Sequence, residues 1–250
     1  MLLHGLMCHA HVWDDLAVDL SRQYRVLALD QRGHGDSEWS KQGFYNVDSH
    51  FCDIKLFVDA LELDPLILIG HSMGGRNALF YTACIHERVD QLILVDTRPG
   101  MNPQAAEELK RQLACLPIQP ASLDMAVQAF GNLYPMISKE WREYMAKHAY
   151  QRHEDGRLVS RYDILMTGQL DESGYEAEDL WYMLENITRP TLIIRGQDSL
   201  FLSREDAMKM ATLIPNAVLK EIPNATHMPA QENPRAFKEV IFEFLGAPIP

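Results

Sequence analysis

Short apolar runs rich in Val, Ile and Leu alternate along this chain with amphipathic stretches, and no other feature limits the fold as strongly. Runs of this length and composition are typical of parallel strands that are covered on both faces. They occupy residues 24–30, 65–70, 91–96, 191–195 and 217–222. Helical patterns lie between them, at residues 12–20, 47–61, 73–86, 203–213 and 234–245. The alternation predicts an α/β fold with a mostly parallel sheet and helices on both faces.

The stretch between Asp96 and Thr191 is too long to be a single crossover between neighbouring strands. It is rich in Tyr, Trp and Met, and helical patterns occupy residues 104–113, 123–133, 139–148 and 175–184. Insertions at the carboxyl ends of strands lie over the active site in this architecture. We therefore predict an α/β core with an inserted helical cap, the core being residues 1–97 and 189–250 and the cap residues 98–188.

Composition narrows the class of protein further. The 250 residues, 47% of them hydrophobic, suffice for one large domain with a buried core. A formal net charge of -12 argues against binding nucleic acid or an anionic membrane surface. No apolar stretch reaches the length of a transmembrane helix, and the first residues do not resemble a signal peptide. We expect a cytoplasmic monomer or homodimer whose cysteines are reduced thiols, namely Cys8, Cys52, Cys84 and Cys115.

The segment Gly70-His71-Ser72-Met73-Gly74 matches G-x-S-x-G. It directly follows the predicted strand 65–70 and opens the helical run 73–86. A sharp turn from strand to helix forces the central serine into a strained conformation and holds its hydroxyl clear of the sheet. The flanking glycines permit close backbone approach, and the helix amino terminus favours developing negative charge. We predict that Ser72 is a catalytic nucleophile; the alternative is a glycine-rich turn with an incidental serine.

His227 follows the last predicted strand, 217–222. A loop at that strand end places an imidazole over the serine, so His227 is the expected general base, with a surface histidine as the alternative. A zinc site is a weaker hypothesis, because the spacing of its candidate ligands matches no standard zinc pattern. Those candidates are His4, Cys8, His9 and His11. We expect neither a metal nor a cofactor.

Taken in order, these motifs resemble the α/β-hydrolase superfamily over essentially the whole chain. They are His4-Gly5 at a strand end, the segment DQRGHGDS at 30–37, GHSMGG at 70–75 and His227 near the end. The resemblance implies a Ser-His-acid triad. It also implies two further strands before His4, and this sequence lacks them. We therefore expect a truncated reading frame or a trimmed chain, with a less stable first sheet edge.

The same resemblance assigns the oxyanion hole to two backbone N–H groups, those of Leu6 and Met73. Side-chain type matters little at these positions, because the donors belong to the main chain. Loss of one such donor typically costs roughly 3–4 kcal/mol of transition-state stabilisation.

The resemblance leaves the triad acid open between two aspartates. In most of the family the acid lies after the strand 191–195, three residues past a glycine, and that place holds Ser199. Asp198 is one position out of register. Asp96 ends the strand 91–96, from which some branches take their acid. We favour Asp96 over Asp198, because a triad is a geometry and not a sequence order. The alternative role of Asp96 is that of a helix or turn cap.

The RGHGDS and GHSMGGR segments are most similar to small-molecule esterases and lactonases, and to the hydrolases of (acetamidomethylene)succinate. A serine at position 72 disfavours the branches that use an aspartate, the dehalogenases and epoxide hydrolases. We therefore expect hydrolysis of a small-molecule carboxylic ester, lactone or amide through an acyl-enzyme. A dicarboxylate would need cationic partners, for which Arg98 and Arg111 are candidates. The alternatives are a slow-turnover signalling or receptor protein and a carbon–carbon bond hydrolase, both on the same fold.

Overall fold

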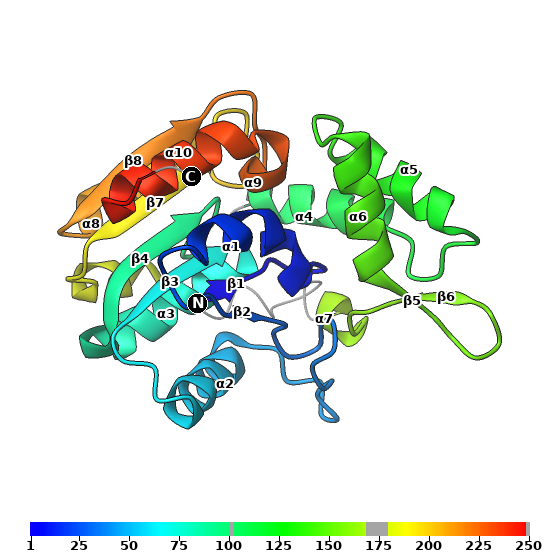
Figure 1. Cartoon of the computed structure of the whole chain (residues 1–250), viewed down its shortest axis with the longest axis horizontal. Coiled ribbons are helices and arrows are strands. Elements are labelled where there is room, and N and C mark those ends of the chain that lie inside the picture. The colour runs from blue at the N-terminus through cyan, green and yellow to red at the C-terminus, as the bar shows by residue number, and fades with distance from the viewer. Residues whose placement is uncertain (101–102, 169–179, 249–250) are drawn as a thin grey trace.

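The computed structural model describes residues 1–100, 103–168 and 180–248 of the chain. One parallel sheet runs through it in the strand order β2-β1-β3-β4-β7-β8 (Figure 1). This sheet confirms the predicted α/β class. Its strands are β1 (Leu2–Leu3), β2 (Ala28–Leu29), β3 (Leu66–His71), β4 (Val89–Val95), β7 (Thr191–Gly196) and β8 (Ala217–Ile222).

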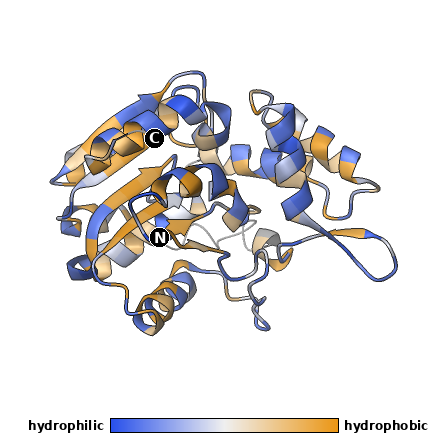
Figure 2. Cartoon of the chain, in the orientation of Figure 1, coloured by the Kyte–Doolittle hydropathy of each residue, from blue (hydrophilic) through white to orange (hydrophobic). Residues whose placement is uncertain are grey.

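The central strands send alternate side chains to opposite faces of the sheet, because successive residues of a strand point to opposite sides. In β4, Leu92 and Leu94 join one apolar cluster, whereas Ile93 and Val95 join another. Figure 2 shows apolar strands between helices that carry hydrophilic residues as well. The first face is covered by α2 (Val47–Ala60), α3 (Met73–Cys84) and α8 (Arg204–Leu213), and the second by α1 (Asp14–Leu20) and α10 (Pro234–Leu245).

The edge strand β2 is shorter than the sequence pattern predicts. The apolar run 24–30 predicts a strand over its whole length, but β2 covers Ala28–Leu29 alone. Its neighbour β1 offers a ladder of two residues, with Leu2 opposite Ala28 and Leu3 opposite Leu29. A strand extends only as far as its partner supplies hydrogen bonds, so the short β1 limits β2. The other strands lie within two residues of their predicted bounds, and β8 coincides with its own.

The segment between β4 and β7 is largely helical, as predicted. Its helices are α4 (Pro103–Cys115), α5 (Leu123–Leu133), α6 (Lys139–Ala149), the short α7 (Leu165–Gly168) and the 3-10 helix η3 (Leu180–Asn186). The predicted helix 175–184 lies partly outside the described residues. An antiparallel hairpin made of β5 (Tyr150–Arg152) and β6 (Leu158–Ser160) follows α6 and was not predicted from the sequence.

Helices α4, α5 and α6 share an apolar cluster with loops at the carboxyl ends of the strands. Leu109, Phe130 and Met145 come from these helices, Leu6 comes from the loop after β1, and Met73 is the first residue of α3. The cluster therefore holds this helical segment over the edge of the sheet at which β3 and β4 end. The domain bounds proposed from the sequence remain a prediction.

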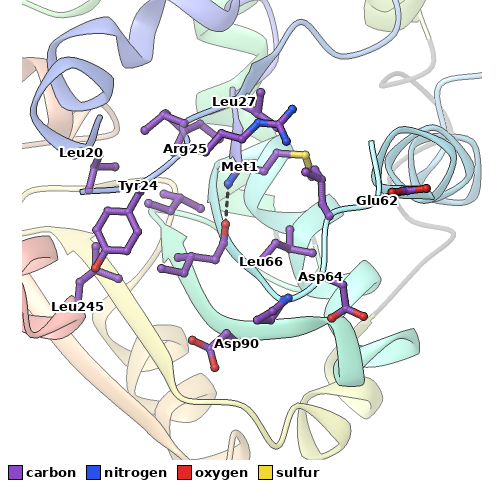
Figure 3. A pocket seen from close by; sticks show the side chains of 16 residues that line it. Met1, Leu20, Tyr24, Arg25, Leu27, Glu62, Asp64, Leu66, Asp90 and Leu245 are labelled. Atoms are coloured by element: carbon purple, nitrogen blue, oxygen red, sulfur yellow. Dashed lines mark hydrogen bonds between the residues drawn. The ribbon is translucent and has the colours of Figure 1, made fainter. Parts of the chain in front are cut away.

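A cavity of about 360 Å³ lies at the opposite edge of the sheet (Figure 3). It is lined by residues from the amino ends of β1 and β3, including Met1 and Leu66. The Met1 amine donates a hydrogen bond to the Ile67 carbonyl at 2.6 Å, and burial lowers the pKa of this amine to about 5. Because the strands are parallel, this cavity is remote from residues that follow their carboxyl ends.

Candidate active site

The turn between β3 and α3 has the strained geometry expected of a nucleophile elbow. Ser72 adopts φ 51° and ψ -118°, in a region that residues with a side chain rarely occupy. A Cβ atom on Gly70 would stand 2.3 Å from the Gly74 carbonyl oxygen, so only glycine fits there. The Ser72 N–H donates to the Val95 carbonyl at 3.0 Å, and the Thr97 hydroxyl donates to the Ser72 carbonyl at 2.7 Å. Contacts to β4 and the residues after it therefore fix the turn.

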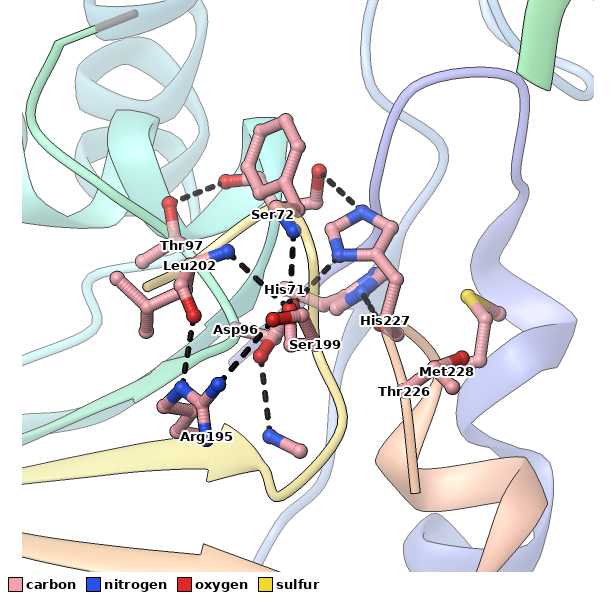
Figure 4. A network of polar contacts seen from close by, with 12 residues as sticks. His71, Ser72, Asp96, Thr97, Arg195, Ser199, Leu202, Thr226, His227 and Met228 are labelled. Atoms are coloured by element: carbon pink, nitrogen blue, oxygen red, sulfur yellow. Dashed lines mark hydrogen bonds and ion pairs between the residues drawn. The ribbon is translucent and has the colours of Figure 1, made fainter. Parts of the chain in front are cut away.

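Hydrogen bonds join Ser72, His227 and Asp96 in one chain (Figure 4). His227 Nε2 stands 3.0 Å from Ser72 Oγ, and His227 Nδ1 stands 2.8 Å from Asp96 Oδ2. All three are buried, with exposed fractions of 8% for Ser72, 6% for His227 and 0% for Asp96. This geometry suits transfer of the serine proton to the imidazole, because Nε2 is within hydrogen-bond reach and Asp96 orients the ring.

The structure places Asp96, rather than Asp198, against the imidazole. Asp96 also accepts hydrogen bonds from the Gly196 N–H at 3.0 Å and from the Ser199 hydroxyl at 2.7 Å. Asp198 is exposed, and its N–H donates to the Ala225 carbonyl at 2.9 Å. The serine at the usual acid position thus becomes a hydrogen-bond donor to the acid of the neighbouring strand.

His71 supports the loop that carries the candidate base, a role that the sequence analysis missed. His71 Nε2 lies 2.7 Å from the His227 carbonyl oxygen, so this nitrogen carries a proton and donates it. Burial, together with repulsion from His227, lowers the pKa of His71 to about 3, and the ring is neutral. His71 is the last residue of β3, and its place directly before Ser72 was the available signal.

Leu6 and Met73, the two predicted oxyanion donors, line one cavity together with Ser72. Met73 is the first residue of α3, so no intrahelical carbonyl is available to its N–H. Leu6 follows β1, the strand beside β3, which brings its backbone next to the elbow. The structure thus gathers both predicted residues around the serine.

The arginines named from the sequence have different surroundings. Arg98 lines the Ser72 cavity, is buried, and pairs with Asp206 at 3.0 Å. Arg111 is half exposed and pairs with Glu108 at 2.7 Å, and it does not line that cavity. Arg76, which the sequence analysis did not single out, lines the cavity from α3. Its position four residues after the nucleophile was the available signal, because residues i and i+4 share a helix face.

Two of the histidines considered as zinc ligands have other hydrogen-bond partners. His4 Nε2 accepts a hydrogen bond from the Gln31 N–H, and His11 bonds to Asp14. Within the described ranges, no three His, Cys, Asp or Glu side chains are grouped as a metal ion requires. Within the same ranges, no helix is long and apolar enough to span a bilayer. All four cysteines are free in the structure.

Buried neutral histidines predict a fold that is sensitive to acid. Burial lowers the pKa of His34 to about 4 and those of His50 and His71 to about 3. In the unfolded chain each has a pKa near 6.5, so below that pH the unfolded state binds more protons. The free energy of unfolding is therefore highest above about pH 6.5, and it falls as the pH drops towards about 4. By about pH 5 each histidine removes up to about 2 kcal/mol.

Urea denaturation at about pH 7.5 and about pH 5 measures this loss. We expect a much lower midpoint at the acid pH, because three such histidines together approach the whole stability of a typical domain, roughly 5–15 kcal/mol. His50→Leu removes one of them, so its midpoint should fall less between the two pH values than that of the wild type. Equal midpoints at both pH values would contradict the prediction.

Comparison with known proteins agrees with the fold. A profile described as the alpha/beta hydrolase fold matches residues 1–234. The chain is similar to 2-(acetamidomethylene)succinate hydrolase of Mesorhizobium japonicum, with 27% identity over 250 residues, 99% of this chain and 87% of the relative. It is similar to an esterase of Mycobacterium tuberculosis, with 27% identity over 96% of this chain and 80% of the relative. A crystal structure of E-2-(acetamidomethylene)succinate hydrolase matches with a TM-score of 0.89 and 26% identity, over 98% of this chain and 90% of that one. The chain therefore belongs to the α/β-hydrolase fold family.

Proposed function

We propose that this protein hydrolyses a small-molecule carboxylic ester through an acyl-enzyme, with Ser72 as nucleophile, His227 as general base and Asp96 as the acid of the triad. The observation that carries the proposal is the buried hydrogen-bond chain from Ser72 Oγ through the His227 ring to Asp96 Oδ2. A serine in a strained elbow with a base at 3.0 Å is poised for acyl transfer.

The reaction divides into two proton-balanced halves. His227 Nε2 takes the hydroxyl proton as Ser72 Oγ attacks the ester carbonyl, and the tetrahedral oxyanion accepts hydrogen bonds from the N–H groups of Leu6 and Met73. His227 returns the proton to the leaving alcohol as the carbon–oxygen bond breaks. A water molecule then loses a proton to His227, attacks the acyl-enzyme and releases the acid, and Ser72 regains its proton.

Asp96 keeps the imidazole in the tautomer that these proton transfers need. Its Oδ2 accepts from His227 Nδ1–H, which leaves Nε2 unprotonated towards the serine. The hydrogen bonds from the Gly196 N–H and the Ser199 hydroxyl hold the carboxylate in place. They also offset the free-energy cost of burying it completely.

The cavity lining favours a substrate that carries a carboxylate. Arg76 and Arg98 line the cavity together with Ser72 and the apolar Leu109 and Phe201. Guanidinium groups bind carboxylates with paired, charge-assisted hydrogen bonds. The names of the Mesorhizobium japonicum relative and of the matching crystal structure specify a succinate derivative as substrate. We therefore propose an anionic acyl substrate, over which the helices α4 to α6 form a cap.

Hydrolysis of p-nitrophenyl acetate and butyrate by the purified chain tests the function. We expect a burst of about one p-nitrophenolate per chain, followed by steady turnover, because acylation and deacylation are separate steps. Succinate should inhibit this turnover at concentrations at least about tenfold lower than its neutral analogue succinamide does, and Arg76→Leu should reduce the difference. A folded wild type that is not acylated would refute the hydrolase proposal. A burst without turnover would favour the receptor alternative.

A further inference from the structure

The short loop that presents the Leu6 amide is strained, although the Cys8 N–H closes its turn by donating to the Gly5 carbonyl at 3.2 Å. This loop, residues 4–7, leaves β1 and turns back at once, and Met7 adopts φ 60°. A residue with a side chain is strained in that region and keeps the conformation only when its surroundings impose it. The contacts that impose it therefore decide where the Leu6 N–H points.

His34 holds the loop from the side that follows Leu6. Its Nε2 accepts a hydrogen bond from the Met7 N–H at 3.1 Å. Its Nδ1 lies 3.1 Å from the Arg32 carbonyl oxygen and donates to it, which leaves Nε2 free of a proton. The side chain is completely buried, and its ring meets the His4 ring edge-on at a centroid distance of 4.8 Å.

Gln31 holds the loop from the side that precedes Leu6. Its side-chain amide donates to the His4 carbonyl at 2.6 Å, and its backbone N–H donates to His4 Nε2 at 3.0 Å. Its Oε1 accepts from Asn77 Nδ2 at 2.8 Å. Asn77 lies on α3, the helix whose first residue is Met73. A continuous chain of buried hydrogen bonds thus ties the loop to the helix that carries the second oxyanion donor.

We propose that His34 and Gln31 are positioning residues of the oxyanion hole, which hold the Leu6 N–H from both sides at a fixed place relative to the Met73 N–H. The proposal rests on the acyl-transfer function proposed above. His34 acts through an acceptor lone pair, and burial keeps it neutral at physiological pH by lowering its pKa to about 4. Neither side chain is among the residues that line the Ser72 cavity, so both act through the main chain of the loop.

Removal of either contact should weaken transition-state binding and leave ground-state binding intact. We expect His34→Leu and Gln31→Met to lower kcat for p-nitrophenyl butyrate by about 10- to 100-fold. A displacement of an oxyanion donor by about 1 Å can cost about 10²-fold in rate. KM should change by less than about threefold. Affinity for a trifluoromethyl ketone, whose hemiketal oxyanion occupies the hole, should fall by the same factor as kcat.

Two further variants separate positioning from folding. His34→Gln retains an acceptor near the place of Nε2 and should recover most of the lost kcat. His50→Leu is the matched control, because His50 is also buried and neutral and lies near enough to His4 and His34 to interact with them electrostatically, whereas the described hydrogen bonds do not join its side chain to residues 4–7. It should retain the wild-type kcat.

The outcomes distinguish this inference from the function on which it rests. If the wild type turns over esters but His34→Leu and Gln31→Met keep its kcat, or change only KM, the positioning role is refuted and the function stands. If the wild type shows no acylation, both proposals fail. Should His34→Leu not fold, Gln31→Met alone decides, since it tests the opposite side of the same loop.

Discussion

Ser72→Ala is expected to abolish ester hydrolysis, with a loss of about 10⁶-fold in kcat, comparable to what removal of a triad serine causes elsewhere. The attacking atom of the proposed reaction is Ser72 Oγ, and alanine leaves His227 Nε2 without a hydroxyl to deprotonate. Substrate should still bind, because the arginines and the apolar lining of the cavity are unchanged. Rates measured with p-nitrophenyl butyrate on wild type and variant, together with the mass of the acylated chain, give the answer.

A second serine variant shows whether such a loss is specific. Ser122 caps helix α5 by accepting a hydrogen bond from the Met125 N–H at 3.2 Å, on the exposed side of the helical segment. Ser122→Ala should lower the free energy of unfolding by about 1 kcal/mol and leave kcat unchanged. If Ser72→Ala retained more than a few per cent of the wild-type rate, or were still acylated, another residue would have to be the nucleophile.

Periodicity was sufficient to predict the elements that contact the core on a regular pattern. Helix α10 begins at Pro234 and ends at Leu245 as predicted, because proline suits the first turn and Gly246, in the left-handed conformation, ends the helix. Strand β8 likewise coincides with the predicted run 217–222. The bounds of such elements depend on neighbouring residues in the chain, so they can be predicted from the local sequence.

Elements whose bounds depend on a distant partner were not predictable in this way. The run 24–30 has the composition of a full strand, yet β2 is limited by the two residues of β1. The hairpin of β5 and β6 lies in half-exposed sequence, where its strands lack an apolar pattern. The Asp155-Gly156 pair was its one local signal, since Gly156 adopts φ 85° at the turn.

The residues of the candidate site also differ in whether local sequence or a distant contact determines their role. Ser72 and His227 were predictable because a motif or a strand end marks each of them. The contributions of His34 and Gln31 were not, because each depends on hydrogen bonds to a loop 27 residues away in sequence. The choice between Asp96 and Asp198 was open for a related reason. Both follow strand ends, and β4 and β7 are neighbours in the sheet, so distance along the chain cannot tell which carboxylate meets the imidazole.

Asp96→Asn is expected to lower kcat by about 10⁴-fold, whereas Asp198→Asn should stay within about twofold of the wild type. The Gly196 N–H is a fixed donor, so an asparagine must turn its oxygen towards it at the place of Oδ1. The amide NH₂ then faces His227 Nδ1, where it can only donate. The imidazole must carry its proton on Nε2 instead, and in that tautomer it cannot accept the proton of Ser72.

The matched pair separates the two aspartates without ambiguity, because the substitutions are chemically identical and the residues lie in very different environments. Asp96 is completely buried and Asp198 is exposed. The kcat of both variants on p-nitrophenyl butyrate, measured across a pH range, decides the assignment, with near-ultraviolet circular dichroism to verify that each is folded. A large loss in Asp198→Asn with a nearly intact Asp96→Asn would transfer the acid to β7. Comparable activity in all three proteins would mean that the imidazole needs no acid to orient it, and the acid role proposed here for Asp96 would fall.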